Sequence, residues 1–171
     1  MLKRTIVAML LVTALPLAPV CAREHGVTES VLIHASQDAV WEAVRDTKHF
    51  DNKIESHVPN EAVVEQRFRS LPLIGETTAT IQVTTIPKKS IDYHLIHSNH
   101  LKALRGSWLL TPISPSETKL QLSSYVVPGL PVPRFLINNF VAMKVRGRLH
   151  KVKVLAEAAS QEVPAKQEIA K

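Results

Sequence analysis

Three histidines recur at every third position in one short segment: His94, His97 and His100. Imidazole is a common zinc ligand, so this spacing raises the question of a metal site. The segment has the composition of a β-strand, and a strand directs His94 and His97 to opposite faces of its sheet. The sequence therefore predicts polar residues at a sheet edge and in a turn, with no metal and no cofactor.

A second candidate for chemistry is an acid–base pair on neighbouring strands. Asp92, Arg105 and Tyr125 lie in predicted strands, and two of them facing one pocket would be enough for proton transfer. Their spacing does not require this, because a cross-strand arginine–carboxylate pair is more often a surface ion pair worth less than about 1 kcal/mol. The chain also lacks a Gly-x-Ser-x-Gly motif, a phosphate-binding loop and a dinucleotide-binding fingerprint. We therefore assign no catalytic residue.

The opening segment has the composition of a secretory signal peptide. Lys3 and Arg4 precede an apolar run of about a dozen residues, and the segment closes at Cys21 and Ala22. Such a run is shorter than the roughly 20 apolar residues of a membrane span. We expect cleavage after Ala22 and export to a periplasm or the cell exterior. The alternative is a lipoprotein anchored through Cys21, although Val20 is larger than the residue that this processing prefers.

Removal of residues 1–22 from the 171 would leave 149, which is enough for one domain with a core. The only cysteine would be lost, which excludes disulfides and thiolate chemistry in the mature chain. The mature chain would carry 19 basic and 15 acidic residues. This charge is too low for a dedicated nucleic-acid binder. We expect a monomer with no nucleic-acid partner.

The mature chain begins with the pattern of a strand followed by a helix. Residues 27–35 alternate in polarity, apart from one mismatch. Ser36 suits a helix N-cap and Asp38 suits the first helical turn, so we predict a helix that ends near Thr47. Residues 50–57 are polar and irregular, and they indicate a short helix or a loop.

After this point the sequence changes to the two-residue period of strands. The predicted strands are residues 63–69, 75–86, 90–98, 103–111 and 118–127. Turn-forming proline, asparagine and serine residues separate most of them, so consecutive strands are expected to pair as antiparallel neighbours. In the second of these strands Ala79, Ile81 and Val83 share one face. That face is predicted to meet an apolar interior and the opposite face to meet water.

A long amphipathic helix is predicted from Pro133 to Ser160, followed by a disordered tail over residues 161–171. Its apolar positions recur at steps of three or four residues: Ile137, Val141, Val145, Leu149, Val152 and Ala156. The opposite face is basic, and it is interpreted first as a solvated surface. Within it Lys144, Arg148 and Lys151 recur at helical spacing, so the alternative is a face that contacts an anionic membrane.

Two stretches resemble one known superfamily. Residues 31–46, VLIHASQDAVWEAVRD, resemble the strand-to-helix opening of START and polyketide cyclase-dehydrase (SRPBCC) proteins. Residues 106–140 resemble the later part, in which Gly106, Trp108, Leu110 and Pro112 form a Gly-x-Trp-x-Leu-x-Pro motif before a proline-rich turn and the final helix. The resemblance implies an α+β helix-grip fold, in which a curved antiparallel β-sheet wraps around a long C-terminal α-helix.

The resemblance also implies a cavity for a hydrophobic ligand between sheet and helix. The candidate ligand-binding residues are Phe68, Ile81, Val83, Tyr93, Leu95, Trp108, Leu110, Leu122, Tyr125, Phe140, Met143 and Gly147. For each of these, ordinary core packing is the competing interpretation. Gly147 is unusual because glycine inside a helix costs about 1 kcal/mol relative to alanine, which suggests close packing against a strand or space for a ligand.

We therefore predict an exported, non-catalytic protein that binds or transfers a hydrophobic ligand such as a lipid, sterol or isoprenoid. The rival is a polyketide cyclase or dehydratase that uses the same cavity, because the fold hosts both functions. A third hypothesis is a binding module for another envelope protein, which an exposed apolar patch would support.

Overall fold

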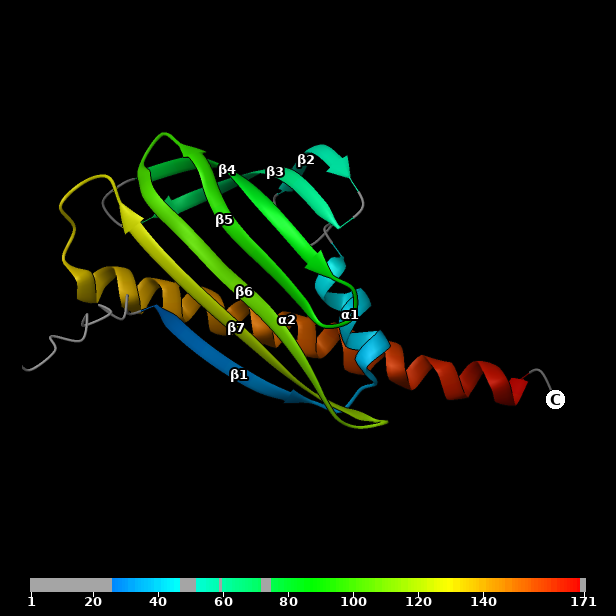
Figure 1. Ribbon diagram of the computed structural model, residues 1–171. Coiled ribbons are helices and arrows are strands. Elements are labelled where there is room, and N and C mark those ends of the chain that lie inside the picture. Colours follow the sequence, from blue (N-terminus) through cyan, green and yellow to red (C-terminus); the bar gives the residue numbers. More distant parts are fainter. Residues whose placement is uncertain (1–25, 47–51, 59, 72–74, 170–171) are drawn as a thin grey trace, which may run out of the picture.

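The computed structural model describes residues 26–46, 52–58, 60–71 and 75–169. In chain order its elements are β1 (Val27–Ile33), α1 (Gln37–Arg45), β2 (Asn52–Val58), β3 (Glu61–Leu71), β4 (Gly75–Ile86), β5 (Ser90–Ser98), β6 (Leu101–Ser114), β7 (Glu117–Pro128) and α2 (Arg134–Ile169). The described strands form one seven-stranded antiparallel sheet in the order β1-β7-β6-β5-β4-β3-β2. This is the predicted α+β helix-grip architecture (Figure 1).

The long helix α2 runs along one face of the sheet beside β1 and β7, and α1 packs against it (Figure 1). Ser36 caps α1 as predicted, since its hydroxyl accepts a hydrogen bond from the Ala39 N–H at 3.3 Å. The apolar side of α1, with Val40, Trp41 and Val44, is buried. Pro133 stands immediately before α2, where its missing N–H costs no helical hydrogen bond.

Strand alternation decides which side chains face α2. Ala79 and Ile81 on β4 are buried, as are Leu120 and Leu122 on β7. These side chains lie on the inner face of the sheet, which is the face toward α2. Leu32 is 42% exposed while its neighbour Ile33 is fully buried, so the alternation predicted for the first strand is confirmed.

A β-bulge in β5 changes the predicted placement of the histidines. His94 pairs with Gln82 and His97 pairs with Thr80, with the register shifting between these two pairs. One extra residue therefore lies between the histidines, and a bulge of this kind restores both flanking side chains to one face. His94 and His97 are both exposed on the outer face, so the prediction that they point to opposite faces is wrong.

The buried apolar residues form two clusters on the inner face. The α1–α2 cluster joins the two helices to β1, β6 and β7, and contains Ile33, Ala35, Val40, Trp41, Ala43, Val44, Trp108, Leu110, Leu120, Leu122, Ile137, Val141, Val145, Leu149, Val152 and Ala156. The β4 cluster lies farther along the sheet and contains Val64, Ala79, Ile81, Leu101 and Leu104. Tyr93 and Val126 pack against both clusters, so they mark the boundary between them.

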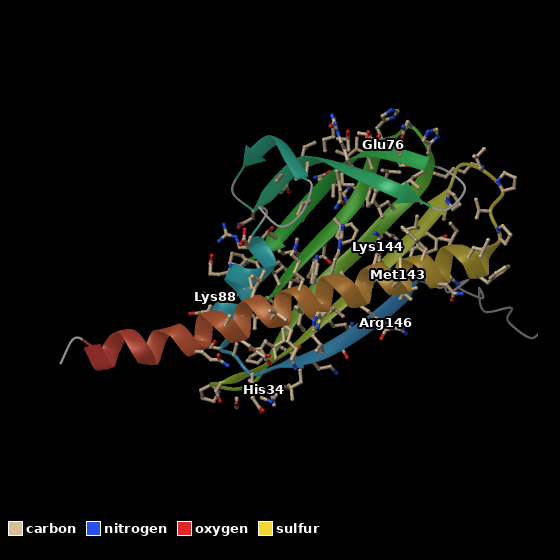
Figure 2. All side chains as sticks on the ribbon, turned by 180° about the vertical axis from the view of Figure 1, so that it is seen from behind. His34, Glu76, Lys88, Met143, Lys144 and Arg146 are labelled. Atoms are coloured by element: carbon tan, nitrogen blue, oxygen red, sulfur yellow. The ribbon has the colours of Figure 1, made fainter. Side chains whose placement is uncertain are left out.

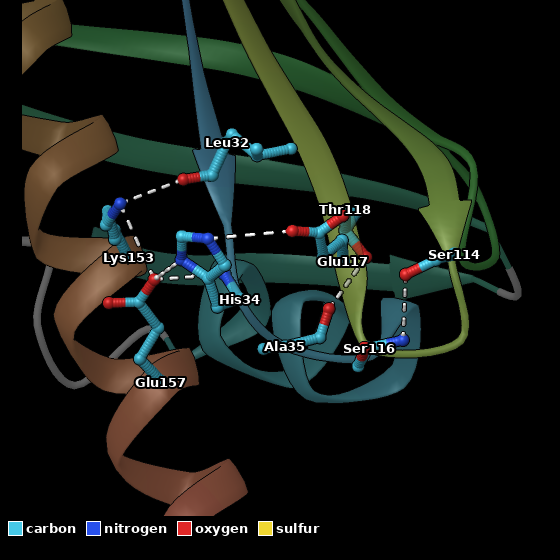
Figure 3. Close-up of polar contacts among 9 residues, drawn as sticks. All are labelled: Leu32, His34, Ala35, Ser114, Ser116, Glu117, Thr118, Lys153 and Glu157. Atoms are coloured by element: carbon cyan, nitrogen blue, oxygen red, sulfur yellow. Dashed lines mark hydrogen bonds and ion pairs between the residues drawn. The ribbon is translucent and has the colours of Figure 1, made fainter.

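Polar contacts fasten α2 to the β1 edge of the sheet. The carboxylate of Glu157 accepts a hydrogen bond from the His34 N–H at 3.0 Å and lies 3.2 Å from the His34 ring nitrogen Nδ1 (Figure 3). Lys153 donates to the Leu32 carbonyl at 2.9 Å and lies 3.5 Å from Glu157. Nearer the start of α2, Arg146 forms an ion pair with Glu29 of β1 at 2.7 Å.

Three predicted boundaries differ from the structure or lie outside it. Residues 52–58 form strand β2, so the short helix or loop predicted for 50–57 is wrong there. The final helix does not end at Ser160 but continues to Ile169, which contradicts the disordered tail up to that residue. The predicted leader, residues 1–22, lies outside the described residues.

Candidate functional site

Half of the predicted ligand-binding residues gather at the β4 cluster. Ile81 belongs to it, and Phe68, Val83, Tyr93, Leu95 and Phe140 pack against it while remaining half-buried. They come from β3, β4, β5 and α2, so elements distant in sequence meet here. This part of the inner face is the candidate site, because its apolar surface is shared between sheet and helix without the dense helical cover of the other cluster.

The other predicted residues lie elsewhere. Trp108, Leu110 and Leu122 are buried in the α1–α2 cluster, where they pack as core. Tyr125 pairs in register with Arg105, and both face the outer side of the sheet. Met143 is 57% exposed, which places it away from the site. Gly147 is exposed, and a Cβ built there would meet no atom within 4 Å, so it does not pack against a strand.

The position of the Tyr93 side chain on the inner face depends on space that a glycine leaves. It pairs with Gly106 across β5 and β6, and a Cβ at Gly106 would collide with the Tyr93 hydroxyl and the Ser123 carbonyl. The missing side chain thus leaves room for the end of the Tyr93 ring beside β6. The Tyr93 hydroxyl donates to the Ser123 carbonyl at 3.4 Å. This is a structural reason for the glycine of the Gly-x-Trp-x-Leu-x-Pro motif.

Tyr93 and Arg148 form an electrostatic pair inside the molecule. Burial raises the pKa of the Tyr93 phenol, while a hydrogen bond with Ser124 and the charge of Arg148 oppose that rise. Burial lowers the pKa of the Arg148 guanidinium, which the interaction with Tyr93 partly offsets. The low water content around both groups disfavours a charge on either. Tyr93 is therefore a neutral phenol at neutral pH, and Arg148 keeps the proton that arginine holds in proteins.

The basic residues of α2 do not form one outward face. Arg148 is half-buried and its charge influences Tyr93, so it is not the exposed residue that the predicted membrane-facing position requires. Lys144 is exposed, and its ammonium lies 5.2 Å from the centre of the Phe140 ring. Figure 2 shows Lys144 on the side of α2 toward the sheet and Arg146 on the β1 side. Lys151 is half-buried. The three predicted residues therefore differ in exposure and do not form one basic surface.

Two buried polar residues of the site were missed by the sequence analysis. Gln66 on β3 is 7% exposed and Thr77 on β4 is fully buried, and both face inward. The Thr77 hydroxyl oxygen has no hydrogen-bond partner among the described residues. A buried hydroxyl left in this state costs about 1–3 kcal/mol. The signal in the sequence was the two-residue period, which puts Thr77 on one face with Ala79 and Ile81, and Gln66 on one face with Val64 and Phe68. We used this period only for apolar residues.

A hollow of about 590 Å³ is lined by residues of the outer face of the sheet and also by Tyr93, Gly106 and Ser124. Its lining includes Asp92, Arg105 and Tyr125, the three residues considered for acid–base chemistry. The Arg105 guanidinium stacks over the Tyr125 ring at 4.6 Å. Because these residues point away from α2, they do not belong to the candidate site on the inner face.

The described part of the chain contains neither a metal site nor a membrane-spanning helix. No group of three histidine, cysteine or carboxylate side chains there has the arrangement of a metal site. Within the same residues, no helix combines the length and the hydropathy needed to cross a bilayer. The described residues offer apolar contact, the Tyr93 phenol and the Thr77 hydroxyl at the candidate site, and the charge of Arg148 acts on Tyr93.

The fold is shared with solved structures. A protein of Thermus thermophilus aligns with a TM-score of 0.67 at 12% identity, over 80% of this chain and 99% of its own. The Zhui aromatase/cyclase from a Streptomyces species aligns with a TM-score of 0.64 at 19% identity, over 78% and 93%. A START superfamily protein from Mycobacterium smegmatis aligns with a TM-score of 0.61 at 18% identity, over 81% and 99%.

These structures confirm the predicted helix-grip fold, which a START superfamily protein and an aromatase/cyclase share. No family model and no curated protein matches the sequence. Because the identities to the solved structures are low, the likeness establishes only the backbone arrangement. The function has to be inferred from the site. Fold and site together define a helix-grip protein whose inner face carries a partly covered apolar cluster.

Proposed function

We propose that this protein binds one hydrophobic small molecule between α2 and the β4 cluster and carries it without changing it chemically. The observation that carries the proposal is the wall made by Phe68, Ile81, Val83, Leu95 and Phe140, which is apolar and only partly covered. Burial of apolar ligand surface yields roughly 25 cal/mol per Å², so such a wall can supply the affinity. A few polar groups then fix the orientation of the ligand.

We further propose that the protein is exported and that it transfers its ligand at a membrane surface. It is supported by the signal-peptide composition of residues 1–22 and by exposed residues near the start of α2. Leu130 and Phe135 are 54% and 63% exposed, and Arg134 and Lys144 add exposed positive charge. Apolar and cationic groups together favour contact with anionic lipid surfaces. Lys144→Gln and Phe135→Ser should each weaken binding to anionic vesicles, and unchanged binding would remove the membrane step.

The test of ligand binding is native mass spectrometry of protein purified from cells that make it. We expect a species heavier than the polypeptide by one apolar molecule, which solvent extraction then identifies. The test variant is Ile81→Gln, at the proposed wall. Its matched control is Leu109→Gln, on the outer face of β6. Loss of the molecule from the first variant alone supports the proposal. A wild-type protein that carries nothing, and takes up no hydrophobic probe, refutes it.

A second candidate function is a cyclase or dehydratase, and the Tyr93–Arg148 pair favours it. A neutral phenol beside a fixed positive charge can donate a proton to a developing enolate. One of the structural neighbours is an aromatase/cyclase. The enzyme hypothesis predicts that the extracted molecule differs from the one supplied and that Tyr93→Phe stops the conversion. The carrier hypothesis predicts that the same molecule is recovered.

A further inference from the structure

The hydroxyl of Thr77 is a buried polar group that the described part of the fold does not use. Thr77 is fully buried on the inner face of β4. Among the buried side-chain oxygens and nitrogens of the described residues, its hydroxyl oxygen is the one without a hydrogen-bond partner. Folded proteins pair nearly all such groups, so an unpaired one indicates a partner that binds from outside.

The polar side chains that approach β4 next to Thr77 are already committed to its backbone. The Asn99 side-chain oxygen accepts a hydrogen bond from the Thr78 N–H at 3.0 Å. The Ser98 hydroxyl donates to the Thr78 carbonyl at 2.8 Å and lies 3.2 Å from the Leu101 N–H, from which it accepts. These bonds fasten the β5–β6 turn to β4, and they leave the Thr77 hydroxyl to a partner on the inner face.

Gln66 brings a second polar side chain to this end of the candidate site. Gln66 pairs with Ala79 and Phe68 pairs with Thr77, so Gln66 and Thr77 are diagonal neighbours on the inner face. Diagonal neighbours lie about 7–8 Å apart, which long side chains can span. An amide offers two N–H donors and an acceptor oxygen, and a hydroxyl offers one donor and an acceptor. Both residues can therefore bond to one ligand oxygen that lies between them.

The surroundings of this polar end are uncharged. Four polar residues of the described chain are buried, and none of them carries a charge: Gln66, Thr77, Ser90 and Thr118. On β3 the neighbouring charges, Glu65 and Arg67, lie on the outer face and pair with each other at 3.5 Å. An ion without a partner is costly to bury, whereas a neutral polar group needs only a hydrogen bond. This end of the site thus favours a neutral group.

An apolar track leads away from Thr77 along β4. Ala79 and Ile81 are buried and Val83 is half-buried on the same face. At about 3.3 Å per residue, the distance along the strand from Thr77 to Val83 is about 20 Å. Val83 pairs with Tyr93, the residue on which the charge of Arg148 acts, so this charge belongs to the opposite end of the track.

Building on the proposed function, we propose that the ligand carries one uncharged oxygen, in a hydroxyl or a carbonyl group, which Thr77 and Gln66 bind. Its apolar body lies along β4 toward Val83. Because Thr77 is fully covered in the ligand-free protein, binding displaces a neighbouring side chain, and Phe68 is in position to move because it lies opposite Thr77 and is half-buried. Long-chain alcohols and aromatic ketones share this chemistry, and they differ in the shape of the apolar body.

Matched ligand pairs test the uncharged oxygen. The pairs are dodecan-1-ol with tridecane, and 2-acetylnaphthalene with 2-ethylnaphthalene, whose members have similar shapes and differ in one oxygen. Dissociation constants come from displacement of the fluorescent probe N-phenyl-1-naphthylamine. Hydration of the free ligands is the same for every variant, so a change in the ratio of the two constants reports the site. In the pair that fits, Thr77→Val should lower the preference for the oxygen-bearing ligand at least about fivefold, the scale of one hydrogen bond.

Further variants locate the effect. Thr77→Ser keeps a hydroxyl and should retain the preference, and Gln66→Met should lower it less than Thr77→Val does. The matched control is Thr118→Val, the same substitution at a fully buried threonine whose hydroxyl donates to the Ala35 carbonyl at 3.0 Å. It should leave the preference unchanged. Circular dichroism of each variant verifies that the protein is folded.

The outcomes separate this inference from the proposed function. A preference that is unchanged by Thr77→Val in both pairs, as it would be if a water molecule already satisfied the hydroxyl, overturns the inference. An equal fall in Thr118→Val overturns it too, and in both cases hydrophobic binding stands if Ile81→Gln still weakens it. Failure of all four ligands to bind, together with an empty protein in native mass spectrometry, overturns both. A preference lost in Thr77→Val and restored in Thr77→Ser supports the inference.

Discussion

Two buried threonines on the inner face show how the half of the molecule around the α1–α2 cluster differs from the half around the β4 cluster. Thr118, beside the α1–α2 cluster, donates to the Ala35 carbonyl at 3.0 Å. Thr77, beside the β4 cluster, is as completely buried and has no partner among the described residues. The first half satisfies its polar groups and packs two helices onto the sheet. The second half keeps an unsatisfied hydroxyl, which a finished core rarely tolerates. The difference agrees with the proposal that one half maintains the fold and the other binds a ligand.

The largest expected effect comes from truncation of an apolar side chain in each half. Leu120→Ala in the α1–α2 cluster should lower the free energy of unfolding by about 3–5 kcal/mol, because a fully enclosed cavity is left. Ile81→Ala should lower it by about 2 kcal/mol, since the β4 cluster is less completely surrounded. Urea denaturation monitored by circular dichroism measures both. Equal losses would mean that the β4 cluster is ordinary core.

The next effect concerns the glycine beneath Tyr93. Gly106→Ala places a methyl group against the Tyr93 hydroxyl and the Ser123 carbonyl, so we expect a loss of about 1–3 kcal/mol in unfolding free energy and weaker binding of the hydrophobic ligand. Gly147→Ala is the control, because it adds a methyl group in open space on a helix and should stabilise the protein by about 0.5–1 kcal/mol. The account of Tyr93 fails if Gly106→Ala is neutral in both measurements.

The same substitution at the two threonines should have opposite signs. Thr118→Val leaves the Ala35 carbonyl without its hydrogen bond and should destabilise the protein by about 1 kcal/mol. Thr77→Val removes a hydroxyl that has no partner in the ligand-free protein and should stabilise it by a similar amount. Thermal unfolding of ligand-free protein compares them. A destabilised Thr77→Val would show that the hydroxyl is already satisfied.

The smallest effect is a change in the pH dependence of stability. The His34 N–H, the His34 side chain and Lys153 lower the pKa of Glu157 in the folded protein below its ordinary 4.5. Glu157 thus stabilises the fold above pH 4.5, and this contribution is lost as the pH falls through the lowered pKa. Glu157→Gln should lower stability at neutral pH and flatten the loss of stability below pH 4.5. Parallel wild-type and variant curves in acid would contradict this assignment.

Local patterns predicted the parts of the fold that depend on neighbours in sequence. The N-cap Ser36 and the alternation in β4 follow from hydrogen bonding and periodicity within a few residues. The β5 bulge does not, because one inserted residue changes which face carries His97 without changing composition. Strand β2 was not predicted because its residues do not alternate between apolar and polar. It is a strand because it pairs with β3.

The candidate site was only partly predictable for the same reason. Apolar members such as Ile81 and Phe140 were found because burial follows hydrophobicity. Arg148 was misplaced because helical periodicity alone cannot distinguish solvent from a space beside a sheet, and a charged residue is normally exposed. Tyr125 was misplaced by the register of β7 with β6, which sets its side chain outside while Ser124 faces inward. Register is a long-range property that one strand's sequence does not contain.

The central claim is that ligand binds in the β4 half and not in the α1–α2 half. The most direct test is methyl NMR of the protein with palmitate that carries a nitroxide near the end of its chain. The account predicts strong broadening of the methyl signals of Ile81, Val64 and Leu104, while Val40, Leu120 and Val152 remain sharp. Broadening of the second set alone, or of neither set at saturating ligand, would contradict it.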